Sequence, residues 1–271
     1  MTESSARQQT HVIVFCQKNR AVRPQHRWRR PQLSDMNGDM SPQSTIVILT
    51  GAGISAESGI ATFRGPGGLW EGYRVEDVCT PDALARDPVL VHRFYDARRA
   101  ALADVMPNAA HQALALLDAA WPGDLLIVTQ NVDDLHERAG ARRLLHMHGE
   151  LLSALCTACA GRQAWAGNLP PGGQCRACGA AALRPDIVFF GEMPYQMDRI
   201  AALLARADLF VSIGTSGAVY PAAGFVQTAR NFGAQTLELN LEPSAGSVFF
   251  SETRLGAASV LVPEWVVGLL G

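Results

Sequence analysis

A glycine-rich stretch, LTGAGISAESGIATFR (residues 49–64), follows a short apolar run and could bind a diphosphate. Gly51, Gly53 and Ala56 satisfy the pattern G-x-G-x-x-G/A, in which glycines let the backbone approach phosphate oxygens closely. Ser55 and the first N–H groups of the next helix could donate hydrogen bonds to those oxygens. A tight strand-to-helix turn without a ligand is the alternative interpretation of this pattern taken alone.

The chain after this stretch is not that of an ordinary dinucleotide fold. An ordinary unit continues through a helix into a second strand, with an acid about 20 residues on that binds the ribose. Here RGPGGLWEG (64–72) follows, which is too rich in glycine to form that strand. Two later apolar runs end in polar groups, IGTS (213–216) and LNLE (239–242). Asn240 or Glu242 could hold an adenosine ribose in place of the missing acid.

Four cysteines fall in two pairs, CTAC (156–159) and CRAC (175–178), which gives C-x2-C-x15-C-x2-C. This spacing brings four thiolates around one tetrahedral ion and predicts a structural Zn²⁺ without a catalytic water. A rubredoxin-like iron site and four unconnected thiols are the alternatives. Cys16 and Cys79 stand alone, so no disulfide framework is indicated. The predicted metal ligands are Cys156, Cys159, Cys175 and Cys178.

Two further stretches carry polar side chains with catalytic or binding chemistry. TQNVDDLHERAG (129–140) crowds two amides and a carboxylate behind an apolar run, where they could hold a carboxamide and a ribose. The alternative makes Asp133 a helix cap. LLHMHGE (144–150) holds His146 and His148 at strand spacing, so we expect them to face the same side. A histidine before glycine, beside a nucleotide site, is a candidate general base at neutral pH.

His111 and His136 lie on helical patterns and are expected to be structural or on the surface.

The elements that must position these residues alternate between strands and helices. Short runs rich in Val, Ile or Leu predict strands covered on both faces, at 45–50, 124–130, 208–216, 236–240 and 258–263. Helical patterns lie between them, at 107–121 with Asn108 as cap, 195–207, and 220–233 closing on Gly233. This alternation predicts an α/β fold with a doubly wound parallel sheet, which binds ligands at the carboxyl ends of its strands.

Two stretches interrupt the alternation, a glycine loop followed by helices and the segment with the paired cysteines. We therefore predict a large part formed by residues 41–65, 106–149 and 191–271. A smaller zinc-binding and helical module would be inserted into it, formed by residues 66–105 and 150–190.

Composition excludes several classes of protein. Of 271 residues, 48% are hydrophobic, and the longest apolar runs are far below the roughly 18 residues of a membrane span. Residues 1–44 carry seven of the 23 Lys/Arg and three of the 25 acids, which leaves 16 basic and 22 acidic residues, or −6, for the remainder. A net negative charge on residues 45–271 argues against direct binding of nucleic acid. No membrane partner is expected either.

The basic N-terminal segment, residues 1–40, is rich in Arg, Gln and Ser, and we expect it to be disordered. A non-functional extension, with Met36 or Met40 as the true start, is the favoured interpretation. An organelle transit peptide is the alternative, whereas VIVFC is too short for a secretory signal.

In their order along the chain, these motifs resemble the sirtuin family of NAD-dependent protein-lysine deacylases. The resemblance covers roughly residues 45–265 and is closest to the class III branch of bacteria, which is also found in mitochondria. The motifs are GAGISAESGIATFR, TQNVDDLHERAG, HMHGE, the paired cysteines, PDIVFFGE, GTSGAVYPAA and NLEPS. Val132 stands where Ile is usual and Phe189 where Trp is common, and both keep an apolar wall.

The resemblance implies a Rossmann-like fold with a small zinc-plus-helical module, and a cleft where NAD meets the acyl-lysine. Residues 60–70 would form a flexible loop over the cofactor. The implied NAD-binding residues are Gly51, Ala52, Gly53, Ser55, Ala56, Glu57, Ile60, Phe63, Arg64, Trp70, Gln130, Asn131, Val132, Asp133, Gly214, Thr215, Ser216, Asn240, Leu241, Glu242 and Ala258.

The implied chemistry consumes NAD without moving a hydride. Asn131 and Asp133 would bind the nicotinamide carboxamide, the acyl oxygen of the substrate would attack C1′, and His148 would act as general base on the ribose hydroxyls. The products are nicotinamide, free lysine and 2′-O-acyl-ADP-ribose. The peptide would pair as a strand between 189–192 and 217–220. The implied substrate residues are Tyr95, Arg98, Val188, Phe190, Gly191, Glu192, Val219 and Tyr220.

Acyl preference is implied by FYDARRA (94–100), which carries the class III pattern Y-x-x-R. Tyr95 and Arg98 share one helix face, where the guanidinium could bind a carboxylate and favour succinyl- or malonyl-lysine. The alternative is a surface Arg98 paired with Asp96 or another acid nearby, and Arg99 is expected to point elsewhere.

Deacylation is the favoured function. Mono-ADP-ribosyl transfer to protein and a non-enzymatic zinc-ribbon binding module are the alternatives. Acylated lysine side chains are the expected partners. We expect a cytoplasmic monomer, or a mitochondrial protein if the N-terminus is a transit peptide.

Overall fold

The computed structural model describes residues 41–62, 69–70 and 72–271, apart from the side chains of residues 69 and 70. The chain divides into a unit of residues 1–38 and a unit of residues 39–271, and the fold described below is that of the second unit. The predicted N-terminal extension, 1–40, lies outside the described residues.

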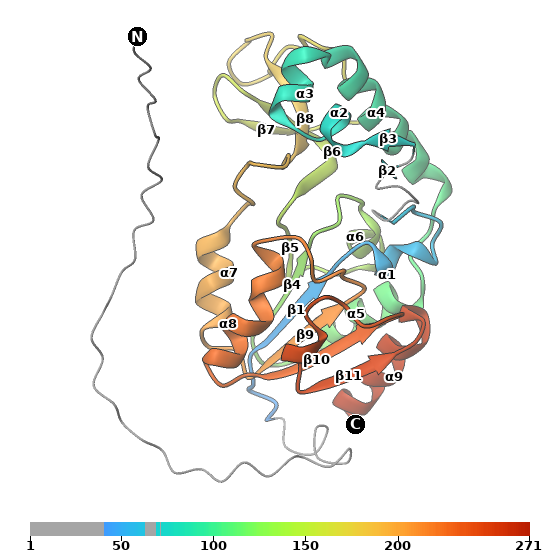
Figure 1. Cartoon of the computed structure of the whole chain (residues 1–271), viewed down its shortest axis with the longest axis vertical. Helices are drawn as coiled ribbons and strands as arrows, with labels where there is room; N and C mark the ends of the chain where they lie inside the picture. The colour runs from blue at the N-terminus through green and yellow to red at the C-terminus, as the bar shows by residue number, and fades with distance from the viewer. Residues whose placement is uncertain (1–40, 63–68, 71) are drawn as a thin grey trace, which may run out of the picture. The chain divides into compact units, whose positions relative to one another are not determined.

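A parallel sheet of six strands forms the centre of the described part of the chain (Figure 1). Its order is β11-β10-β9-β1-β4-β5, and every neighbouring pair is parallel. The chain runs outward from β1 through β4 and β5, then returns to the other side of β1, so the carboxyl ends beside β1 are the expected ligand site. The strands are β1 (Ile46–Thr50), β4 (Leu125–Thr129), β5 (Leu144–His146), β9 (Leu209–Ile213), β10 (Gln235–Asn240) and β11 (Glu252–Leu255). The α/β prediction is confirmed.

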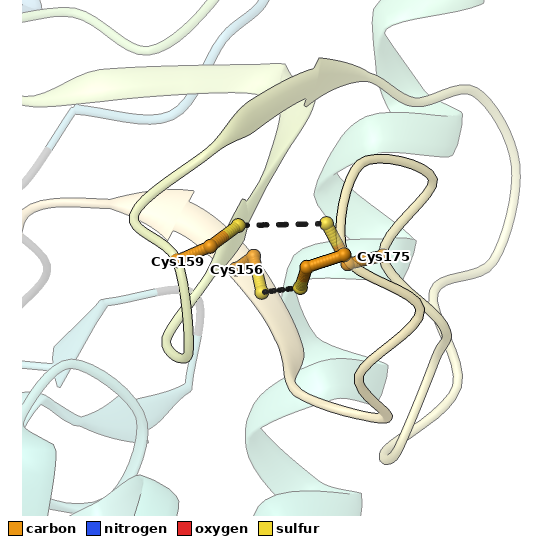
Figure 2. Close-up of side chains that lie close together, drawn as sticks. Cys156, Cys159 and Cys175 are labelled. Carbon is orange, nitrogen blue, oxygen red and sulfur yellow. Dashed lines mark hydrogen bonds between the residues drawn. The ribbon is translucent and has the colours of Figure 1, made fainter.

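A smaller layer of antiparallel strands and helices lies beyond these carboxyl ends (Figure 1). Its three-stranded sheet has the order β7-β6-β8 and ends in the loops that carry the cysteines, three of which are labelled in Figure 2. Thr80 and Asp87 cap two of its helices, and a proline follows each cap. The elements are β2 (Leu69–Trp70), β3 (Tyr73–Arg74), α2 (Val75–Val78), α3 (Pro81–Arg86), α4 (Pro88–Ala101), η1 (Leu102–Asp104), β6 (Gly149–Cys156), β7 (Arg162–Ala164) and β8 (Leu183–Ile187).

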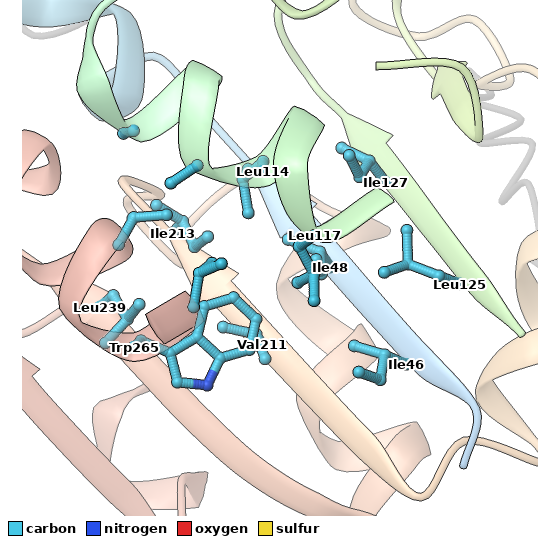
Figure 3. Packing of buried hydrophobic residues seen from close by; sticks show 14 of the residues in the cluster. Ile46, Ile48, Leu114, Leu117, Leu125, Ile127, Val211, Ile213, Leu239 and Trp265 are labelled. Carbon is cyan, nitrogen blue, oxygen red and sulfur yellow. The ribbon is translucent and has the colours of Figure 1, made fainter. Parts of the chain in front are cut away.

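Helices cover both faces of the parallel sheet, and alternation along β1 shows why. Ile46 and Ile48 pack with Leu114, Leu117 and Trp265 under α5 and α9 (Figure 3). The residues between them in β1 pack on the opposite face, under α7 and α8. A strand apolar on both faces is therefore required, as its sequence indicates. The helices and turns are α1 (Gly53–Ala56), α5 (Ala109–Ala120), α6 (Leu135–Ala139), α7 (Met197–Leu204), η2 (Ala222–Gly224), α8 (Phe225–Asn231), η3 (Ser247–Phe249) and α9 (Ala258–Leu270).

The predicted strand at 258–263 is wrong, because these residues begin α9. Val262, Trp265 and Val266 are buried at helical spacing on the core side, and Pro263 lies inside the helix. A short apolar run does not distinguish a strand from a buried helix. The outermost strand is instead β11, whose polar residues suit an edge with one neighbour.

Within the residues that the structure describes, no helix is both long and apolar enough to cross a membrane.

Candidate active site

A cleft of about 780 Å³ lies at the carboxyl ends of the parallel strands and extends to the smaller layer. Its volume is within the range of small-molecule and cofactor sites. Nearly all of the described residues that the sequence assigns to the site line it. They are Gly51, Ala52, Gly53, Ala56, Glu57, Ile60, Arg98, Gln130, Asn131, Val132, Asp133, His148, Val188, Phe190, Gly191, Glu192, Gly214, Thr215, Ser216, Val219, Tyr220, Asn240, Leu241, Glu242 and Ala258.

The exceptions are informative. Ser55 and Tyr95 are fully buried and lie behind the cleft wall. Phe63 and Arg64 lie outside the described residues, as does the side chain of Trp70. Most of the loop assigned to residues 60–70 is therefore untested.

The glycine loop after β1 is held against the loop after β9. The Gly51 N–H donates to Ile213 O at 3.0 Å, and the Gly53 N–H donates to Gly214 O at 2.8 Å. A Cβ added to Gly53 would lie 2.7 Å from Gly214 Cα, which no packing tolerates. These glycines are thus required by the close approach of two strand ends, and the same approach lines the cleft with backbone rather than side chains.

Ser55 is fully buried and supports the cleft wall from behind. Its Oγ donates to Asp133 Oδ2 at 3.1 Å and accepts from Asn131 Nδ2 at 3.1 Å, and it lies 3.3 Å from His111 Nε2. One hydroxyl therefore joins the amide and the carboxylate of two strand-end residues. The first turn of α1 carries the Ser55 side chain inward, and contact of Ser55 with a diphosphate stays a prediction.

Asp133 lines the cleft and lies one residue before Asp134, which is the cap residue of α6. The Asp133 Oδ1 accepts the Leu135 N–H at the start of that helix at 3.2 Å. Burial raises the pKa of Asp133, although the hydrogen bonds from Leu135 and Ser55 act to lower it. Asn131 is only 7% exposed, and its N–H is bound by Thr129 Oγ1 at 3.0 Å. Both side chains are therefore fixed before any ligand arrives.

His148 is the cleft histidine. Its Nδ1 lies 3.2 Å from Gln130 O, and because a carbonyl only accepts, Nδ1 carries the proton and Nε2 is left as an acceptor. Burial lowers the pKa of His148, opposed by that hydrogen bond, so the ring is neutral at pH 7.

His146 does not share that side, since β5 ends at His146 and the strand alternation stops there. Its Nε2 lies 2.6 Å from Glu137 Oε1, and its Nδ1 lies 2.9 Å from Asn131 O. Burial acts to lower the pKa of His146, but the hydrogen bond and charge of Glu137 outweigh it and raise the pKa. His146 therefore positions the Asn131 backbone and is not a second base in the cleft.

His111 and His136 are structural, as one of the two expectations held, and neither is exposed. Their rings meet edge to face at 4.9 Å, and His136 Nε2 lies 3.1 Å from Thr50 Oγ1. Burial lowers the pKa of His111 to about 4 and places the pKa of His136 well below the ordinary histidine value. Both rings are therefore neutral hydrogen-bonding groups beneath the cleft.

The far end of the cleft is shaped by strand ends β9 and β10. Asn240 Nδ2 donates to Thr215 O at 2.7 Å, so it joins the two loops as well as lining the cleft. Glu238, which the sequence reading missed, is buried and accepts hydrogen bonds from Ser244 N–H and the Thr253 hydroxyl. Its place between Leu237 and Leu239 of a buried strand was the available indication.

Glu57 is held to a neighbouring helix. Its carboxylate accepts the Ser259 N–H at 3.0 Å and the Ser259 hydroxyl at the start of α9. These bonds lower the pKa of Glu57. Glu57 thus lines the cleft with its carboxylate already occupied, so it joins α1 to α9.

One wall of the cleft is formed by Arg98 of α4, which is only 8% exposed. Tyr95 lies behind this wall, stacked on Phe189 at 6.0 Å. Asp96 pairs with Arg99 at 2.6 Å, and both Arg98 and Arg99 are buried rather than on the surface.

Cys79, which the sequence set aside as a lone thiol, also lines this wall. It is in hydrogen-bonding contact with the Tyr95 hydroxyl, and burial raises the pKa of the Cys79 thiol.

The four paired cysteines converge on one point, as predicted. Their sulfurs all lie within 4.8 Å of one another, with Cys156 and Cys178 3.7 Å apart and Cys159 and Cys175 3.8 Å apart (Figure 2). Zinc–sulfur bonds of about 2.3 Å in a regular tetrahedron place sulfurs about 3.8 Å apart, whereas a disulfide needs about 2.05 Å. The cluster therefore fits one structural Zn²⁺, and four thiolates fill its coordination shell.

Comparison with known proteins agrees with this geometry. The Sir2 family model matches residues 51–221. The NAD-dependent protein deacylase of Yersinia pseudotuberculosis is 56% identical, over 82% of this chain and 81% of that one. A solved Sir2 homologue–NAD complex superposes with a TM-score of 0.76 at 39% identity, covering 84% of this chain and 91% of that one. A solved structure of Sir2 bound to an acetylated peptide superposes with a TM-score of 0.69 at 26% identity, covering 83% of this chain and 94% of that one. A family match over more than half of the chain, together with relatives this similar, shows that the chain belongs to the Sir2 family of sirtuins.

Proposed function

We propose that this chain is an NAD-dependent protein-lysine deacylase that removes succinyl- and malonyl-type groups as well as acetyl groups. The observation that carries the proposal is a single cleft lined by the glycine loop, by His148 and by the buried Arg98. Relatives named NAD-dependent protein deacylase and Sir2 complexes with NAD and with an acetylated peptide support the general activity.

The residues of the cleft suit NAD. The backbone-lined loops at Gly51–Gly53 and Gly214 leave room for a diphosphate, and Thr215, Ser216 and Asn240 offer polar groups for the adenosine ribose. When bound, NAD supplies an electrophilic ribose C1′ and nicotinamide as leaving group. Asn131 and Asp133 then bind the carboxamide, with both side chains held in place by Ser55.

His148 is the general base of the proposed reaction. Its free Nε2 and its neutral ring at pH 7 allow it to take a proton from a ribose hydroxyl. Residues 188–192 and 219–220 line the same cleft and would hold the substrate peptide as an added strand.

Glu192 contributes to this peptide site indirectly. Its carboxylate is bound by Arg184 at 2.6 and 2.7 Å, so it fixes the segment that would hold the peptide.

The acyl preference rests on Arg98. A guanidinium that is 8% exposed in a cleft wall can bind a carboxylate through paired charge-assisted hydrogen bonds, shielded from water. Succinyl- and malonyl-lysine carry that carboxylate, and acetyl-lysine does not. Tyr95, as a class III tyrosine, would act from behind the wall through Cys79 and Phe189.

The test incubates the protein with NAD and peptides that differ only in an acetyl or a succinyl group on lysine. Mass spectrometry should find nicotinamide and both acyl-ADP-ribose products, and nothing should form without NAD. ADP-ribose on protein without an acyl product would instead support the transferase alternative. Acetyl turnover without succinyl turnover would overturn the acyl preference alone. A monomeric state and a cytoplasmic or mitochondrial location stay predictions.

A further inference from the structure

Helix α4 carries a second polar face that the reaction does not use. Its first face carries Arg98, which lines the cleft wall proposed to bind the acyl group, and Tyr95, which lies behind that wall. The second face consists of His92, Asp96 and Arg99, which are spaced four and three residues apart and therefore share one side of the helix. This face meets the chain between the two cysteine pairs, on the smaller layer (Figure 1).

Both backbone polar groups of Leu169 are bound by this face. His92 Nδ1 donates to Leu169 O at 2.7 Å, and the Leu169 N–H donates to Asp96 Oδ1 at 2.9 Å. His92 is 3% exposed, and burial lowers its pKa, so the ring is a neutral donor. The loop and the helix are therefore fixed to each other in one register.

Arg99 completes the contact. Its Nε donates to Leu151 O of β6 at 2.6 Å, and its NH1 donates to Gly167 O at 3.0 Å and to Asp96 Oδ1 at 2.6 Å. The Arg99 side chain is 2% exposed, so these bonds are shielded from water. We call His92, Asp96 and Arg99, with Leu151, Gly167 and Leu169, the α4 seam.

The seam extends to the four-cysteine cluster through one side chain. Leu169 is fully buried and packs in a small apolar cluster with Cys156, Cys175 and Leu183. Its backbone holds α4 and its side chain packs on the metal ligands, so the position of α4 depends on the cysteine module.

We propose that the α4 seam determines acyl-group selectivity by fixing the rotation of α4, with His92, Asp96 and Arg99 as positioning residues for Arg98. This inference rests on the proposed function. A rotation of about 10° moves a group at the rim of a helix of about 6 Å radius by roughly 1 Å. Paired hydrogen bonds from a guanidinium to a carboxylate are sensitive to such a shift, whereas an acetyl group makes no such bonds.

The test replaces His92 with a ring of similar size that cannot donate, His92→Phe, and with a short amide that can, His92→Asn. Both proteins are assayed with NAD and matched succinyl- and acetyl-peptides. For His92→Phe, the ratio of desuccinylation to deacetylation in kcat/KM should fall about fivefold or more, through a higher KM for the succinyl-peptide. His92→Asn should keep the wild-type ratio. An unchanged ratio in His92→Phe, or no recovery in His92→Asn, would overturn the inference.

Leu204→Ala serves as the control for a general loss of stability. It opens a cavity in the apolar cluster under α7 and α8, which does not include α4. This variant should keep the ratio, and a fall equal to that of His92→Phe would overturn the inference. If His92→Phe does not fold, Asp96→Asn replaces it under the same criterion.

Amide exchange separates the seam from the proposed function. In His92→Phe, the amides of residues 92–99 should exchange about tenfold faster or more, while those of α5 do not change. If the wild type shows no NAD-dependent desuccinylation but exchange is faster in His92→Phe, the proposed function is wrong and the seam still holds α4. If exchange is unchanged in His92→Phe, the seam does not hold α4 and the inference is wrong.

Discussion

Arg98 and Arg99 are neighbours in the chain, yet their surroundings give them different roles. Arg99 is bound to a carboxylate and two backbone carbonyls through its Nε and NH1. Arg98 lies in the cleft wall, 5.7 Å from the centre of the Phe94 ring. One residue of offset turns a side chain by about 100° around a helix, which is enough to separate a structural arginine from one that meets a ligand.

Replacing Arg98 should separate two activities of the proposed enzyme. Arg98→Met keeps the apolar stem and removes the guanidinium, so kcat/KM for a succinyl-peptide should fall about tenfold or more while deacetylation stays within about threefold. Arg93→Met, the same change on the exposed side of α4, is the matched control and should alter neither. Equal loss of both activities in Arg98→Met would refute its role in acyl recognition.

The pH profile should report the neutral ring of His148. Because burial lowers its pKa below the ordinary value of 6.5, the base is present at pH 7 and is lost as the pH falls through the lowered pKa. The profile of kcat/KM should therefore be level from about pH 7 to 8 and decline only below about 6.5. Asp133, whose pKa is raised by burial, also gains a proton as the pH falls, so Asp133→Asn separates its contribution to the limb from that of His148. An acid limb centred above the ordinary histidine value would contradict this assignment.

Chemistry-bearing side chains were predicted well from the sequence where the motif itself places them. The four cysteines, His148 and the polar ends of the parallel strands come together as their spacing indicates. The burial of Ser55 was not predicted, because a helix of one turn gives no periodicity to read. Cys79 and Glu238 were missed, since their roles depend on partners distant in the chain.

At the scale of elements, strands were predicted best because they are buried on both faces and must be apolar throughout. The residues at 258–263 satisfied the same rule but form α9, which is also buried, and only its length of 13 residues distinguishes it from a strand. That rule did not predict strand β11, because most of its residues are polar. Edge position, which is set by topology, decides the composition of such a strand.

Asn108 caps the start of helix α5, and replacing it should lower the stability of the protein by a measurable amount. Its Oδ1 caps α5 through the Ala110 N–H at 3.0 Å, and its Nδ2 donates to Ile54 O at 2.8 Å and to Ser58 Oγ at 3.0 Å. Asn108→Ala removes both functions and should lower the free energy of unfolding by about 2 kcal/mol, measured by urea denaturation. Asn108→Asp keeps the cap and loses only the donors, so its loss should be smaller. Equal losses would show that the cap contributes nothing.

At the scale of the whole molecule, the two layers differ in how they are stabilised. The parallel sheet is covered by large apolar clusters on both faces. The smaller layer has one cluster between its helices and strands β6 and β8, and a small cluster that includes two of the metal ligands. Small cores need an added constraint, and a metal provides one. The described ligand cleft is lined from both layers, so its shape depends on the smaller layer as well as on the parallel sheet.

Removing zinc should therefore unfold one layer before the other. Analysis of the purified protein should find one zinc per chain, and a strong chelator should speed amide exchange across residues 149–187 while β1, β4 and β9 stay protected. Activity should fall with that exchange and return when zinc is restored, because the metal closes the smaller layer and carries no catalytic water. Cys178→Ser should reproduce the exchange pattern without a chelator, and Cys79→Ser, a thiol outside the cluster, should not. Simultaneous exchange of both layers would mean that the metal stabilises the entire fold rather than the smaller layer alone.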